Sequence, residues 1–420
     1  MLSRTKLFAN KFSELDYFSL FIVLILNIIG LAAIYSATSY TGSDIGFSHP
    51  FIKQLITLFA ALFFLVFLFS VKKAFLESYA LIFYIVGILL IIAPFFIGGT
   101  DATNTNRWFD LGFFRFQPSE FMKFFLIIML AHFFSSTKIS PNRVRYALIP
   151  LAIALLPTGI VFLQPDLGTS LVYMAIFMGI LFSAGTRLYH IFLIVAPIIT
   201  ILAAFNITTF FIWGIIIGII VLLNNANIWK MVSIFFLNIG VGLITPLIWG
   251  SLKAYQKQRI ITLFNANLDP QGAGYQVLQS QIAIGSGGLK GKGFMNGTQT
   301  HLRFLPEQHT DFIFSVIAEE FGFIFVSIIF FLFLMLIIKW QRMAFSARDK
   351  FGTLIIIGSS TALLFHIFIN VGMTIGIMPV TGKPLPFISY GGSFLITCYG
   401  LLALILNGNS EQIPQKDYYS

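Results

Sequence analysis

Long apolar segments of about 20 residues recur along the whole 420-residue chain, and polar stretches separate them. Because an α-helix rises 1.5 Å per residue, about 20 residues are enough to cross the roughly 30 Å hydrocarbon core of a bilayer. The pattern predicts an all-α polytopic membrane protein that forms one domain over residues 1–420. The twelve predicted spans lie at 17–38, 51–71, 78–98, 118–136, 145–163, 168–184, 188–205, 207–223, 229–249, 310–338, 352–376 and 386–407.

The apolar region 188–249 has few polar breaks, and the predicted number of helices depends on how it folds. Its breaks are residues 206–209 and the sequence NNANIWK at 224–230. We interpret 188–223 as a tight helical hairpin. A single long element in its place would reduce the number of spans to eleven and move the carboxyl terminus to the other side of the membrane.

Composition agrees with a membrane protein. The chain is 57% hydrophobic and 10% charged, whereas soluble domains are about 25% charged. The first apolar segment is too long for the hydrophobic region of a cleavable signal peptide, so it is predicted to be a span. The single cysteine, Cys398, lies in an apolar segment, which argues against an intrachain disulfide and against a thiolate metal site.

The distribution of basic residues predicts the orientation. The net charge is +10, but most basic residues lie in short connections between spans, which is typical of cytoplasmic loops and not of a nucleic-acid surface. The segments predicted to be cytoplasmic are both termini, 72–73, 138–145, 187, 230 and 339–350. The connections at 99–117, around Asp166, at 251–309 and at 377–387 are then predicted to face outward.

The outer loop 251–309 belongs to a polar, glycine-rich stretch, 256–320, that the apolar helices do not account for. Its basic residues outnumber its acidic ones, against the positive-inside tendency, although long loops translocate largely regardless of charge. Binding of an anionic group would explain the excess. Attraction to anionic lipid headgroups is the alternative.

Ionisable residues are rare within the predicted spans, and each is costly there, so each is a functional candidate. Glu120 and Lys123 stand three residues apart on one face of a helix that Pro118 is placed to open. One interpretation is a buried ion pair that fixes helix packing. The other is a pair that lines a cavity near the outer surface, with Lys123 available to a phosphate.

Other acidic residues are predicted near the outer ends of helices. Asp166 can cap the helix that follows it by accepting hydrogen bonds from free backbone N–H groups, and this is the simpler of its two interpretations, the other being substrate binding. Asp311, Ser315 and Glu319 are spaced by four and form a polar stripe on one helix face. Glu320 points elsewhere and is interpreted as a packing partner.

The segment 379–393, PVTGKPLPFISYGGS, contains three prolines and three glycines. Irregular backbone at membrane depth persists only where it is buried in protein or lines a cavity. Broken helices, carboxylates and basic groups are thus predicted at one face of the bundle. That combination favours either a transporter with its site at helix breaks or an enzyme that acts on a lipid-linked substrate at the outer leaflet.

Five motifs in order give the sequence a family resemblance. They are NRWFDLGFFRFQPSEFMK, FLQPDLGTS, DPQGAGYQVLQSQIAIGSGGLKGKG, FLPEQHTDFIFSVIAEEFG and GIMPVTGKPLPFISYGGS. Over nearly its whole length the chain resembles the SEDS family (shape, elongation, division and sporulation), which are bacterial peptidoglycan polymerases. The sequences IAIGSGGLKGKG, GTQT, FLPEQHTDFIF and VTG are more similar to the elongation members than to the division members.

The resemblance implies a fold, an activity and a partner. The family usually has ten spans, so the SEDS-type bundle here would carry an inserted hairpin within 188–249 and a catalytic extracellular loop at 251–309. Family members join lipid II units: the 4-hydroxyl of one acceptor sugar attacks a second lipid-linked chain, which leaves undecaprenyl diphosphate. The implied partner is a class B penicillin-binding protein, a transpeptidase of the elongation machinery.

Asp269 corresponds to the essential carboxylate of the family. A carboxylate that accepts a proton from a sugar hydroxyl accelerates attack by about 10²–10⁴-fold, and Gly272 and Gly274 would allow close approach of the backbone to a ligand. Without the resemblance, a turn at Asp-Pro-x-Gly is the simpler interpretation. The GSGGLKGKG sequence can also present backbone N–H groups to the diphosphate as an anion-binding concavity. The predicted substrate-binding residues are Glu120, Lys123, Asp166, Arg259, Lys290, Lys292, Arg303, Asp311 and Glu319.

Other functions stay open at this point. No metal-ligand motif is present in the sequence, although Mg²⁺ or Mn²⁺ could be held by a carboxylate together with substrate phosphates. The alternatives to polymerisation are a lipid II flippase or other transporter, the division-specific branch of the family, and a scaffold that recruits a transpeptidase without catalysis. The essential carboxylate motif argues against the scaffold.

Overall fold

The structure is a computed structural model, and the residues it describes are almost all helical. They are 15–39, 46–47, 49–97, 107–110, 112, 115–141, 143–223, 228–251, 257, 272–301 and 307–410. The helices are α2 (Tyr17–Ser39), α3 (Pro50–Ser70), α4 (Lys73–Ser78), α5 (Ala80–Ile92), α6 (Pro94–Ile97), α7 (Pro118–Ser136), α8 (Arg145–Leu163), α9 (Leu167–Ser183), α10 (Leu188–Ala203), α11 (Ile207–Leu223), α12 (Ile228–Ser251), α14 (Ala273–Gly287), α15 (Thr298–His301), α16 (Ile313–Ser346), α17 (Lys350–Thr374) and α18 (Gly392–Asn409). A two-stranded antiparallel sheet pairs β1 (Phe109–Asp110) with β2 (Arg115–Phe116).

The predicted all-α membrane fold is confirmed. Each predicted span coincides with a helix of the structure, and the span predicted at 78–98 is divided into α5 and α6. Within the described residues, seven helices are long and apolar enough to cross a membrane, and five further apolar helices are shorter. The last helix begins at Gly392, later than predicted, because residues 386–391 are irregular. The β1–β2 hairpin was not predicted.

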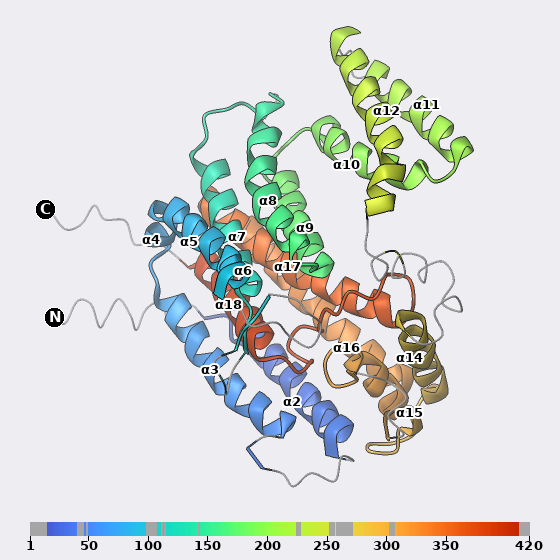
Figure 1. Cartoon of the computed structure of the whole chain (residues 1–420). Helices are drawn as coiled ribbons and strands as arrows, with labels where there is room; N and C mark the ends of the chain where they lie inside the picture. Colours follow the sequence, from blue (N-terminus) through green and yellow to red (C-terminus); the bar gives the residue numbers. More distant parts are fainter. Residues whose placement is uncertain are drawn as a thin grey trace, which may run out of the picture.

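Helix α17 lies at the centre of the bundle and packs against α7, α9, α16 and α18 (Figure 1). Its most apolar 18-residue window is 72% buried, and that of α18 is 83% buried, whereas that of α3 is 17% buried. Polar residues at 366, 370 and 374 therefore lie inside protein and not against lipid. The central helices position the site described below.

Helices α10, α11 and α12 pack on one another and project from the bundle, which they meet where α10 contacts α9 (Figure 1). The hydroxyl of Thr200 donates to the side-chain oxygen of Asn238 at 2.7 Å, and the indole N–H of Trp213 donates to Thr200 at 3.0 Å. These bonds join all three helices. The tight hairpin predicted at 188–223 is formed by α10 and α11, with a turn at 204–206 between them; that it is an insertion relative to the family stays a prediction.

Helix α16 is interrupted at Gly322, whose φ of 75° and ψ of −177° lie in a region that side chains exclude. The carbonyls of Glu319 and Glu320 consequently lose their helical partners. They accept instead from the backbone N–H groups of Lys292, at 3.0 Å, and Gly293, at 2.8 Å.

The other side of the break is completed in the same way. The N–H groups of Phe323 and Ile324 donate to the carbonyls of Gly288, at 2.9 Å, and Leu289, at 3.2 Å. Two helical hydrogen bonds are thus replaced by four bonds to residues 287–293. We call this segment, bonded across the break in α16, the glycine clip.

A second polar contact lies far from the break, at the end of the bundle predicted to be cytoplasmic. Lys73 forms an ion pair with Asp349, which caps α17 by accepting from the backbone N–H of Gly352 at 2.8 Å. The Lys73 side chain is only 4% exposed and also donates to the carbonyls of Gly408 and Ser410. This pair fastens α4 to α17 and to the end of α18.

Candidate active site

Helix α7 brings the first predicted pair into the protein interior. Pro118 occupies the first turn of the helix, as predicted. The Nζ atom of Lys123 lies 2.6 Å from Oε2 of Glu120 and 2.8 Å from Nε2 of His366 on α17. Lys123 and Glu120 are 0% and 2% exposed. The ion pair is therefore formed and buried, and Lys123 is enclosed by protein.

Asp166 caps α9, as its position predicted. Its carboxylate accepts from the backbone N–H of Thr169 at 3.0 Å, from the Thr169 hydroxyl at 2.8 Å and from the side-chain amide of Gln117 at 3.0 Å. Burial raises the pKa of this carboxyl, but Lys383, Arg107 and the Thr169 hydrogen bond outweigh burial and bring the pKa down to about 2. Asp166 is thus a stably ionised group.

Lys383 reaches Asp166 from the irregular segment between α17 and α18. Its Nζ lies 3.0 Å from Oδ1 of Asp166 and also donates to the hydroxyl of Thr169. Its carbonyl accepts from the side-chain amide of Asn370 at 2.7 Å, and the same amide donates to the carbonyl of Asp311 at 2.9 Å. Lys383 therefore connects α9, α17 and the start of α16.

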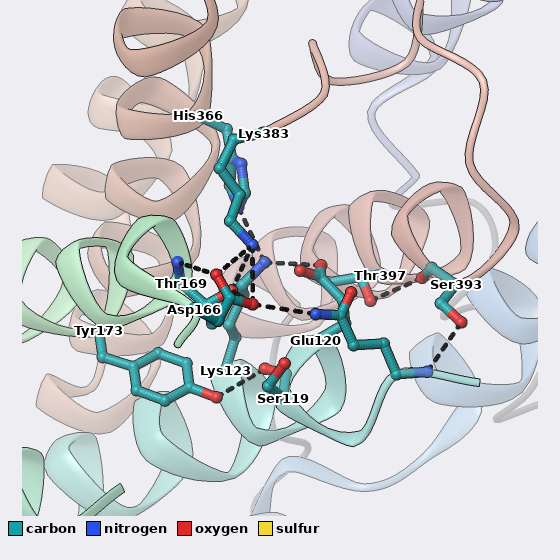
Figure 2. Close-up of polar contacts among 11 residues, drawn as sticks. Ser119, Glu120, Lys123, Asp166, Thr169, Tyr173, His366, Lys383, Ser393 and Thr397 are labelled. Carbon is teal, nitrogen blue, oxygen red and sulfur yellow. Dashed lines mark hydrogen bonds and ion pairs between the residues drawn. The ribbon is translucent and has the colours of Figure 1, made fainter. Parts of the chain in front are cut away.

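Figure 2 shows the side chains of Glu120, Lys123, Asp166, Thr169, His366 and Lys383 converging between α7, α9 and α17. We define the charged cluster as Arg107, Glu120, Lys123, Asp166 and Lys383. Arg107 acts on Asp166 electrostatically, and Lys123 and Lys383 act on each other. The Nε atom of Arg107 is buried and has no hydrogen-bond partner. With three cations and two anions, the charged cluster carries one excess positive charge.

Helix α14 packs against α16 and against the end of α17. Its residue Ser280 is hydrogen-bonded to Ser315 at 2.6 Å and donates to the carbonyl of Thr374 at 2.7 Å. Val277, on the same helix, belongs to a buried group that also contains Val380, three residues before Lys383. The start of α14 is therefore packed against the segment that supplies Lys383.

Of the predicted polar stripe, Ser315 and Glu319 lie on α16 and contact α14 and the residues that follow it, whereas Asp311 lies in the turn before α16 begins at Ile313. Glu319 is fully buried, and its Oε1 accepts from Nζ of Lys292 at 2.7 Å, from the hydroxyl of Thr298 at 3.0 Å and from the backbone N–H of Gln299 at 3.0 Å. Glu320 points to α2 and accepts from the Ser36 hydroxyl at 2.5 Å, which fits its predicted packing role.

The structure corrects one interpretation of the glycine-rich sequence. The backbone N–H groups of Gly291, Lys292 and Gly293 donate to protein carbonyls, those of Gly287, Glu319 and Glu320. These three N–H groups are therefore committed to the glycine clip and do not form an anion-binding concavity. Lys290 is exposed beside them.

Asp269, Arg259 and Arg303 lie outside the described residues. Among the described residues, no group of three or more His, Cys, Asp or Glu side chains could hold a metal ion.

Sequence reasoning missed Lys383, His366 and Arg107. Lys383 lies in a segment interpreted from its prolines and glycines alone. His366 could have been recognised, because an ionisable residue in an apolar span is itself a signal. Arg107 had no such signal, since it lies in a polar connection.

Comparison with known proteins gives consistent matches over nearly the whole chain. A family described as cell cycle protein, comprising FtsW, RodA and SpoVE, matches residues 17–211 and 191–412. The peptidoglycan glycosyltransferase MrdB of Escherichia coli is 35% identical over 94% of this chain and 93% of its own length. The peptidoglycan glycosyltransferase RodA of Treponema pallidum is 34% identical over 96% and 99%.

Solved structures agree. A chain from a peptidoglycan synthase complex, solved to show how polymerization and crosslinking are coordinated, has a TM-score of 0.70 at 26% identity and covers 94% of this chain and 97% of that chain. The rod shape determining protein RodA of Thermus thermophilus has a TM-score of 0.61 at 24% identity, covering 94% and 96%, and supports the fold.

Proposed function

Because this chain belongs to the family of cell cycle proteins that includes FtsW, RodA and SpoVE, we propose that it is a peptidoglycan glycosyltransferase that polymerises lipid II during cell-wall elongation. Two relatives that bear the name peptidoglycan glycosyltransferase, MrdB and RodA, match it over more than nine-tenths of its length. Their names support an enzyme over a flippase.

One observation carries the proposal: the segment that supplies Lys383 to the buried, net-positive cluster packs against the start of α14, and the proposed base precedes α14 in the chain. Asp269 comes three residues before Gly272, the residue that precedes α14. Chain connectivity limits the separation of their Cα atoms to about 11 Å. A carboxylate and a cationic site for a diphosphate are therefore expected close together.

The reaction follows from these two groups. The 4-hydroxyl oxygen of the acceptor sugar forms a bond to C1 of the donor sugar, and the bond from C1 to the diphosphate oxygen breaks. The proton of the hydroxyl passes to the carboxylate of Asp269, which acts as general base. The electron pair of the broken bond leaves with undecaprenyl diphosphate, whose negative charge the positive field of the charged cluster stabilises.

The predicted binding residues take different parts in this proposal. Lys290 is exposed and suited to direct contact with a phosphate, and Arg259 and Arg303 are assigned the same role. Lys292 is 26% exposed and tied to Glu319, so we assign these two to holding the loop. Glu120 and Lys123 are enclosed and act through their charge, and Asp311 acts through the backbone contact with Asn370.

The partner and the orientation are part of the proposal. The structural neighbour from a synthase that couples polymerization to crosslinking supports a class B penicillin-binding protein as partner. We place both termini in the cytoplasm and the 251–309 loop outside, on the distribution of basic residues. If a divalent cation binds, the Asp269 carboxylate would hold it together with substrate phosphates, and the ion would neutralise part of the negative charge of the leaving group.

The test uses purified protein, lipid II and gel separation of glycan products, with and without the transpeptidase partner. Wild-type protein should form glycan chains, and Asp269→Asn should be folded but inactive. Asp110→Asn is the matched control, since it removes an exposed carboxylate from the β1–β2 hairpin and should keep wild-type activity. Glycan chains of normal length from Asp269→Asn would remove Asp269 from the mechanism. Movement of labelled lipid II across vesicle membranes without polymer would favour transport.

A further inference from the structure

Lys383 is a buried lysine whose hydrogen-bonding capacity is already used. Its ammonium contacts both carboxylate oxygens of Asp166, at 3.0 and 3.2 Å, and the hydroxyl of Thr169. An ammonium has three hydrogens to donate. The side chain passes directly over Gly168, where an added Cβ would lie 2.5 Å from Cε of Lys383. This geometry is that of an internal partner and leaves no hydrogen for a ligand.

The charge of the cluster depends on this contact. Arg107, Lys123 and Lys383 are set against Glu120 and Asp166, which leaves an excess of one positive charge. If Lys383 were neutral, two cations would face two anions and the excess would vanish. Asp166 would keep its other donors, Gln117 and Thr169, so its negative charge would remain.

We propose that Lys383 is a positioning residue that serves as the internal counter-ion of Asp166, so that the charged cluster stays net positive toward the diphosphate of lipid II. This inference rests on the proposed function and adds a residue that does not touch substrate. Lys383 also holds the 379–393 segment in place, because its side chain is bonded to Asp166 and Thr169 at the start of α9 and its own carbonyl accepts from Asn370 on α17. One side chain thus fixes both the charge and the wall of the site.

The experiment measures the dissociation constant of fluorescent lipid II for purified wild-type protein and three variants. Lys383→Met keeps the length of the side chain and removes its charge, and should weaken binding about tenfold or more, the order expected for one uncompensated charge several ångströms from an anion. Asp166→Asn with Lys383→Met restores the excess of one, and asparagine still caps a helix, so binding should return to within about threefold of wild type.

The matched control is Lys73→Met. Lys73 is as buried as Lys383, at 4% against 5% exposed, and is likewise paired with an aspartate, but it lies at the other end of the bundle. It should lower thermal stability and leave lipid II binding unchanged. If Lys383→Met does not fold, the affinity of the double variant for lipid II is compared with that of wild type, and this comparison decides the test.

Three results would overturn the inference. The first is wild-type binding by Lys383→Met. The second is weak binding by the double variant, either as weak as that of Lys383→Met or tenfold weaker than that of wild type. Lys383 would then contact substrate or act through packing. The third is equal weakening by Lys73→Met. Binding is measured without turnover, so the two proposals can fail separately. A wild-type protein that binds lipid II but makes no glycan would contradict the proposed function, and the comparison of binding between the variants would still test the role of Lys383.

Discussion

Replacing Gly322 by alanine should open the glycine clip. The backbone at this position is restricted to glycine, and forcing another residue into such a conformation costs about 1–3 kcal/mol. The added Cβ would also lie 2.2 Å from the backbone nitrogen of Gly291 and 2.7 Å from the carbonyl oxygen of Leu289. Neither atom belongs to a side chain that could rotate away, so the clip must move.

The size of the effect follows from the bonds at the break. The four backbone hydrogen bonds there contribute about 0.5–1.5 kcal/mol each, so their loss and the strain together come to several kcal/mol. The Tm of a domain of 150–250 residues falls by about 2–4 °C for each kcal/mol of unfolding free energy that is lost, and the Tm of a larger chain falls by less. We expect the apparent Tm of Gly322→Ala in detergent to fall by about 5 °C or more.

Two measurements check this reasoning. Thermal unfolding gives the apparent Tm, and hydrogen exchange read by mass spectrometry should show faster exchange in peptides that cover 287–299 and 319–326. Gly218→Ala in α11 is the control, because an added Cβ meets nothing within 4 Å there, and alanine is the better helix former by about 1 kcal/mol. An unchanged Tm together with unchanged exchange at both peptides would refute the proposed role of the break.

Three further predictions concern ionised groups. Lys123→Met should destabilise the protein by about 3–5 kcal/mol in thermal unfolding, because it leaves Glu120 buried and unpaired; adding Glu120→Gln should recover most of the loss, and no recovery would argue against the pair. Glu319→Gln should speed hydrogen exchange around Lys292, whose ammonium loses its carboxylate; unchanged exchange would contradict this. The pKa of Asp166 is lowered from 3.8 to about 2, so the stability that its ionised form contributes is complete above about pH 4 and is lost toward pH 2. We therefore expect Asp166 to cause no change of Tm between pH 8 and pH 5. A change of Tm in that range that Asp166→Asn abolishes would contradict this prediction.

Local sequence predicted much of the fold and part of the site. Spans followed from apolar length, the Glu120–Lys123 pair from its spacing of three, and the Asp166 cap from the proline before it. Each of these depends on residues close together in the chain.

What escaped prediction depends on residues far apart. Lys383 and Asp166 are 217 positions apart in the sequence, and neither of the two motifs indicates that their side chains are in contact. The break at Gly322 also gave no warning, because a single glycine is tolerated in many helices, and here its conformation is set by the segment 287–293.

Cys398 is the single thiol of the chain, and it is fully buried. Maleimide reagents therefore find no accessible native target, and a cysteine introduced at the surface becomes the sole labelling position without prior removal of others. Lys290 and Lys138 are both exposed and are predicted on opposite faces of the membrane. Lys290→Cys and Lys138→Cys, labelled in intact cells with an impermeant reagent, would report the face of each position directly.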